Sequence, residues 1–95
     1  MSYLKKIVLH CPNGCPPNLE QLVAEFRAAG VIYVGVVGKD CSRIEDIIDE
    51  ICVGYGDDVY DLLTVSHPNE SLEQAVEFTR SLGSEYAGDV QVGEC

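Results

Sequence analysis

The stretch HCPNGCPP, residues 10–17, concentrates side chains that could do chemistry. It holds an imidazole and two thiols, His10, Cys11 and Cys15, between an apolar run and a predicted helix. Thiolates and imidazoles bind zinc, and thiolates also act as redox groups or nucleophiles. Three residues separate the two cysteines, whereas thioredoxin-type motifs and zinc knuckles keep two. The stretch therefore leaves open a thiol-redox site, a zinc site and a stiff turn.

A second candidate thiol follows the next apolar run. Cys41 lies between Lys39 and Arg43 and just before a predicted helix start. Neighbouring cations and a helix amino terminus favour a thiolate. Cys52 instead lies on the apolar side of a predicted helix, as a small core residue would. The candidate catalytic thiolates are Cys11, Cys15 and Cys41. The same three residues and His67 are the candidate zinc ligands.

Alternating apolar runs and amphipathic stretches predict the elements that position these residues. The runs read as strands covered on both faces, and the amphipathic stretches carry apolar residues at helical spacing. Ser42 and Glu45 form the pattern of a capping box that would start the second helix. The predicted strands are 3–10, 31–37, 59–66 and 89–93, and the predicted helices are 18–29, 42 to Gly54, and 70–82.

This alternation predicts one small three-layer α/β domain over residues 1–95. Strands that alternate with helices form parallel βαβ units with right-handed crossovers. We expect a four-stranded, mainly parallel sheet in the order 2-1-3-4, with helices on both faces. The last strand is then at an edge, which leaves dimerisation open.

Parallel strands bring all their βα turns to one edge, where α/β proteins bind ligands. The two histidine-bearing turns and the turn after the second strand would meet there. Together these turns would form a ligand-binding edge, at which bases, amides and cations could bind a small anionic ligand. The residues expected to line it are His10, Asn13, Gly14, Lys39, Asp40, Ser42, Arg43 and His67.

The strand-Cys-loop-helix arrangement of residues 5–15 resembles, in outline, the phosphocysteine loop of sugar-phosphotransferase IIB domains. That resemblance implies a phosphoryl site at Cys11 in a small four-stranded α/β unit. The sequence departs from it because Pro12, Pro16 and Pro17 remove three amide donors. Dinucleotide-type glycine patterns and serine-nucleophile patterns are absent, so the sequence does not decide whether the protein is an enzyme.

The composition favours one class of partner over others. Sixteen acidic and six basic residues give a net charge of −10, which disfavours binding to nucleic acids and to anionic membranes. No long apolar span or secretory pattern occurs, so we expect a cytoplasmic protein. The expectation is therefore a small acidic binding domain with a Cys/His ligand edge. The alternatives are a thiol-redox or zinc protein, and an acidic inhibitor or immunity-type module for a basic protein.

Overall fold

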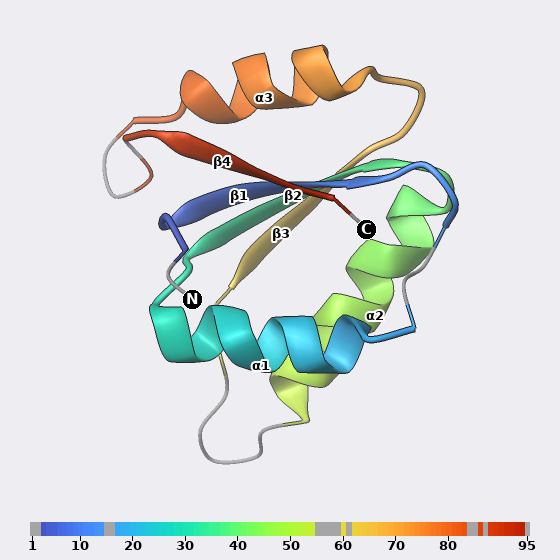
Figure 1. The fold of residues 1–95 in the computed structure, drawn as a ribbon, viewed down its shortest axis with the longest axis vertical. Helices are drawn as coiled ribbons and strands as arrows, with labels where there is room; N and C mark the ends of the chain where they lie inside the picture. Colours follow the sequence, from blue (N-terminus) through green and yellow to red (C-terminus); the bar gives the residue numbers. More distant parts are fainter. Residues whose placement is uncertain are drawn as a thin grey trace.

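The computed structural model describes residues 3–14, 17–54, 60, 62–83, 86 and 88–94. Strands and helices alternate along the chain, and all strand pairs are parallel, which confirms the predicted α/β class (Figure 1). In chain order the elements are β1 (Lys6–Cys11), α1 (Leu19–Ala29), β2 (Tyr33–Gly38), α2 (Cys41–Val53), β3 (Leu63–His67), α3 (Leu72–Arg80) and β4 (Val90–Glu94).

The strand order is β3-β2-β1-β4, so the predicted order 2-1-3-4 is wrong. The chain builds outward from β1 through β2 to β3 and then crosses back to add β4 on the other side of β1. Burial explains this order. Almost all of β1 and β2 is buried, as central strands require, whereas β3 and β4 are only partly buried. The reversal of strand order, where such folds bind ligands, therefore lies between β1 and β4.

The crossover direction also distributes the helices. Two crossovers in the same direction place α1 and α2 on one face of the sheet, and the reversed crossover places α3 on the other (Figure 1). The α1–α2 face buries a large apolar cluster that includes Ile7, Val23 and Ile44. The α3 face buries a much smaller one around Val8, Val37 and Ala75.

The helix starts differ from the predicted ones. α2 begins at Cys41 with Asp40 as its N-cap and has no side-chain cap, so the predicted Ser42–Glu45 capping box is absent; the Glu45 carboxylate accepts the Ser66 backbone N–H at 3.2 Å. The capping box occurs at α3, where Ser71 and Gln74 exchange bonds of 3.1 and 2.8 Å. No helix in the described part of the chain has the length and apolar character needed to span a membrane.

Candidate functional site

A backbone carbonyl joins the turns that follow β1 and β2. The Cys11 carbonyl accepts the Lys39 N–H at 3.0 Å and the Gly14 N–H at 3.3 Å. Gly38, at φ +115°, lets the strands approach so closely that a Cβ there would lie 2.5 Å from this oxygen. Asp40 lies against Gly14, with its Oδ2 3.2 Å from the position of a Cβ on that glycine. The structure thus brings Gly14, Lys39 and Asp40 together, as predicted.

Among the described residues, the predicted thiols Cys11 and Cys41 and the two imidazoles lie on opposite faces of the sheet. Successive strand residues alternate in direction, so His10 and Cys11 point to different faces. Cys11 and Cys41 both belong to the apolar cluster under α1 and α2, and Cys41 is only 3% exposed. His67 instead lies under α3 and contacts Phe78. Thiols buried in an apolar cluster are poorly placed for redox, nucleophilic or phosphoryl chemistry, whatever their spacing in sequence.

The two histidines are also separated from each other. Both are in register with Val37, one on each side of it, so two strand spacings, about 9–10 Å, lie between their backbones. The His10 Nδ1 pairs with the Glu94 Oε2 at 3.0 Å, at the β1–β4 reversal. The His67 Nδ1 pairs with the Glu70 Oε2 at 2.7 Å. Each imidazole therefore has its own carboxylate and they do not form one site.

The predicted zinc site finds no support in the described residues. No three His, Cys, Asp or Glu side chains among them are arranged to hold a metal ion. Cys15, a candidate ligand and thiolate, lies outside the described residues. Burial raises the pKa of the Cys52 thiol, and the Asp49 charge raises it further, which suits its predicted core position. Of the other predicted ligand residues, Asn13, Lys39 and Arg43 are exposed, and the exposed Ser42 hydroxyl contacts that of Ser66 at 3.5 Å.

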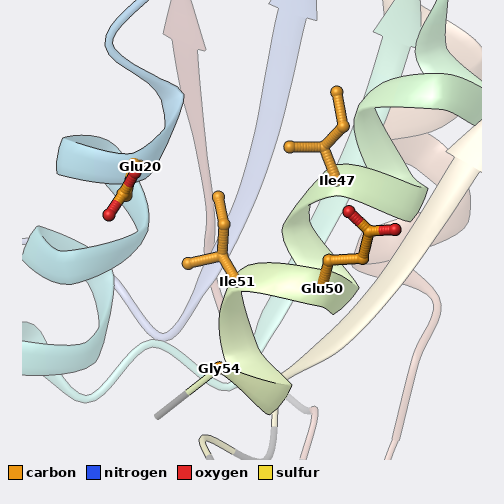
Figure 2. Close-up of a pocket in the computed structure, with 5 residues that line it drawn as sticks. All are labelled: Glu20, Ile47, Glu50, Ile51 and Gly54. Carbon is orange, nitrogen blue, oxygen red and sulfur yellow. The ribbon is translucent and has the colours of Figure 1, made fainter.

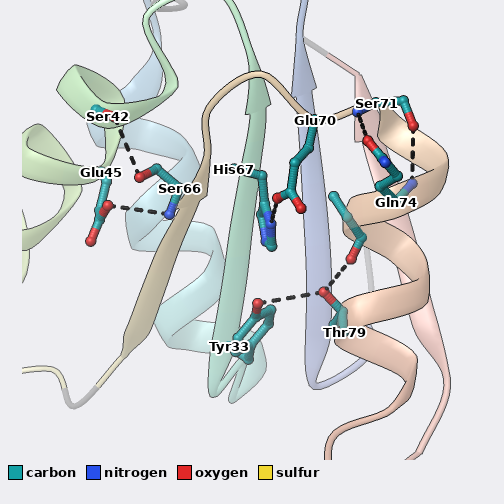
Figure 3. A network of polar contacts seen from close by, with 10 residues as sticks. Tyr33, Ser42, Glu45, Ser66, His67, Glu70, Ser71, Gln74 and Thr79 are labelled. Atoms are coloured by element: carbon teal, nitrogen blue, oxygen red, sulfur yellow. Dashed lines mark hydrogen bonds and ion pairs between the residues drawn. The ribbon is translucent and has the colours of Figure 1, made fainter.

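The space under α3 holds a row of buried polar groups that the sequence pattern did not reveal (Figure 3). The Lys6 ammonium donates to the Thr79 carbonyl in the last turn of α3 at 2.9 Å, where a helix favours positive charge. The Thr79 hydroxyl contacts the Tyr33 hydroxyl at 3.5 Å, and burial raises the pKa of Tyr33. His67 is 4% exposed, and its Nε2 has no hydrogen-bond partner. These groups orient α3 on the sheet and are too deeply buried to meet a ligand.

An open groove of about 290 Å³ lies between α1 and α2 (Figure 2). Ile47 and Ile51 point from α2 toward α1 and form an apolar floor. Glu20 on α1, Glu50 on α2 and Gly54 also line it, and the Glu50 carboxylate points away from α1 (Figure 2). Both glutamates are exposed, whereas the isoleucines are half-buried. The groove therefore combines an apolar surface with two solvated negative charges.

The α2 helix continues this negative charge away from the groove. Glu45, Asp46, Asp49 and Glu50 form an acidic strip along its outer side, and Asp46, Asp49 and Glu50 are exposed. Burial, followed by the charges of Glu45 and Asp46, raises the pKa of Asp49. Among the described residues, no salt bridge joins these four carboxylates to a lysine or arginine. The strip is thus crowded with like charges that the described residues do not neutralise.

This groove was not predicted from the sequence. The available signal was the width of the apolar side of α2, which also includes Ile44, Ile48 and Cys52. A helix resting on a sheet covers only its central apolar positions, and here Ile44 and Ile48 are fully buried. The flanking isoleucines must therefore face another helix, which is α1.

The fold and this surface define a small acidic α/β domain with a helix–helix groove. Residues 4–92 match the model of a family described as a domain of unknown function, DUF7684, and the chain belongs to that family. Searches of curated proteins and of solved structures gave no match.

Proposed function

We propose that this protein is a binding module for cationic segments of a partner protein, and that the α1–α2 groove is its recognition site. The observation that carries the proposal is that two glutamates, Glu20 and Glu50, line the same groove as Ile47 and Ile51. Arginine and lysine have the matching composition, because each has an aliphatic stem and a cationic head. The stem would lie on the isoleucines, and the head would pair with a glutamate.

The acidic strip supports the same proposal. A net charge of −10 attracts cationic partners over several ångströms and raises the rate of encounter. Glu45, Asp46 and Asp49 would then pair with further cations of the bound segment and relieve their mutual repulsion. Cys41 and Cys52 carry free thiols, which suits the reducing cytoplasm, and we propose that compartment as the place of action.

A peptide titration with charge-matched variants tests the proposal. The probe is an arginine-rich peptide with glycine and serine spacers. Its affinity for the protein is measured by calorimetry at low salt. Replacing Glu20→Gln and Glu50→Gln together should weaken binding about tenfold, because two exposed ion pairs at about 0.2–1 kcal/mol each are lost. The control variant, Glu73→Gln with Glu77→Gln on α3, removes the same charge outside the groove and should change affinity less than twofold.

Two results would contradict the proposal. One is an absence of binding by the peptide at millimolar concentrations. The other is equal weakening by both double variants, which would mean that total charge, and not the groove, sets the affinity.

A further inference from the structure

The α3 face of the sheet is covered unevenly. Two helices cover the opposite face, whereas α3 alone covers this one and packs mainly over β1, β2 and β4 (Figure 1). Leu63 and Val65 of β3 point to the uncovered side, because they share the face of His67. Leu63 is 41% exposed, Phe78 on the adjoining flank of α3 is 46% exposed, and Val65 is half-buried. We call Leu63, Val65 and Phe78 the β3 patch.

Phe78 of the β3 patch rests on a buried ring. The Phe78 ring packs edge-on against the buried His67 ring, with centroids 5.3 Å apart, and Glu70 orients that imidazole from its other side. Phe78 thus has a neighbour that holds its ring in place beside β3. Large apolar side chains gathered on an otherwise charged surface are typical of an interaction site.

Carboxylates flank the β3 patch from both adjoining layers. Glu70, whose side chain is 42% exposed, lies in the turn between β3 and α3 on one side. Glu45 reaches the same strand from the α2 side of the sheet, where it accepts the Ser66 N–H (Figure 3). An apolar patch with Glu70 beside it, on a chain of net charge −10, matches an amphipathic helix with an apolar side and cationic flanks.

We propose that the β3 patch docks a cationic amphipathic helix of a partner protein, which takes the position of a second helix beside α3. The five residues of β3 extend about 17 Å, which a helix of about 11 residues matches. Charge complementarity favours this occupant over a second copy of the chain, because two copies bring together net charges of −10 each. Leu63, Val65 and Phe78 lie outside the α1–α2 groove, and the two proposals share only the Glu45 carboxylate of the acidic strip.

Two peptides of identical composition test it. One is a Leu/Lys peptide of about 14 residues with its leucines on one side of a helix, and the other has the same residues in scrambled order. The amphipathic peptide should bind the full chain at least tenfold more tightly in a fluorescence anisotropy titration. Leu63→Ser with Phe78→Ser should remove that gain. The matched control is Val92→Ser, because Val92 is 42% exposed on the same face at the opposite edge, and it should change affinity less than twofold.

The contrary outcomes are distinct. Equal binding of the two peptides would overturn the docking proposal, and it would leave the proposed function standing if Glu20→Gln with Glu50→Gln weakens both. A gain lost in the Val92→Ser variant would move the surface to β4 and overturn it as well. Peptide-free dimerisation that the Leu63→Ser and Phe78→Ser changes abolish would assign the patch to a second copy instead.

Discussion

Replacing Asp49 by asparagine should stabilise the protein at neutral pH, although it removes a charge from the surface. Asp49 lies three residues after Asp46 and four after Glu45, so it has two like-charged neighbours on the same side of α2. Each such pair costs about 0.2–0.5 kcal/mol, and asparagine has nearly the same helix propensity as aspartate. The expected gain in the free energy of unfolding is therefore about 0.4–1 kcal/mol. For a domain of this size, that is a rise of about 2–8 °C in melting temperature.

The sign of the pH dependence follows from the raised pKa of Asp49. A carboxyl with a higher pKa in the folded state than in the unfolded state binds its proton more readily when folded. The wild type therefore gains stability, relative to the variant, as pH falls through the raised folded value toward the ordinary unfolded value. The advantage of Asp49→Asn should be complete above the folded pKa and absent below the unfolded one.

Urea unfolding at pH 7 in low salt, at pH 7 in high salt, and near pH 3 measures this. The advantage of the variant should shrink in high salt because salt screens the exposed charges. Glu20→Gln is the control, because Glu20 occupies the first turn of α1, where a helix favours negative charge, and its loss should destabilise by about 0.3–1 kcal/mol. An Asp49→Asn protein that is less stable than wild type at pH 7 in low salt would refute the argument from charge crowding.

Three further changes test the fold around the predicted edge. Gly38→Ala should lower the free energy of unfolding in urea by about 3 kcal/mol or more, because the backbone there is left-handed and a Cβ would meet the Cys11 carbonyl. The control, Gly83→Ala, places its Cβ in open space and should change that free energy by less than about 0.5 kcal/mol. Similar values for both variants would contradict the close approach at Gly38. Ser71→Ala should cost about 1 kcal/mol through loss of the capping box, and an unchanged urea midpoint would argue against that cap. In a variant lacking Cys15 and Cys95, the three remaining thiols are buried and should react with a thiol reagent only after the variant unfolds. A thiol that reacts fast in the folded variant would contradict this, because it would show that one of these cysteines is accessible.

The sequence was sufficient to predict the alternation of elements but not the order of the strands. Apolar runs and helical spacing depend on local burial, which the sequence records directly. Strand order depends on which strands lie in the centre of the sheet with a neighbouring strand on each side. The run VIYVGVV of residues 31–37 indicated such a central strand. It is apolar throughout, whereas Thr64 and Ser66 interrupt the following strand. The second strand therefore belonged in the middle of the sheet.

The turns that carry the predicted site residues lie together, but their side chains point to different faces of the sheet. The turns after β1 and β2 do meet, through the Cys11 carbonyl. Sequence position brings residues to an edge, but the twofold alternation of a strand decides the face on which each side chain lies. Applied to the adjacent His10 and Cys11, that alternation would have separated imidazole from thiol. The α1–α2 groove was beyond such reasoning, because it depends on how two helices sit side by side.

Amide chemical-shift mapping tests the central claim, cation recognition at the α1–α2 groove, most directly. Uniformly labelled protein would be titrated with the arginine-rich peptide and followed by heteronuclear NMR. The account predicts that the largest shifts occur at Glu20, Ile47, Glu50 and Ile51, and that about 500 mM salt reverses them. Shifts concentrated at the βα turns after β1 and β2, or spread evenly over the acidic surface, would contradict it.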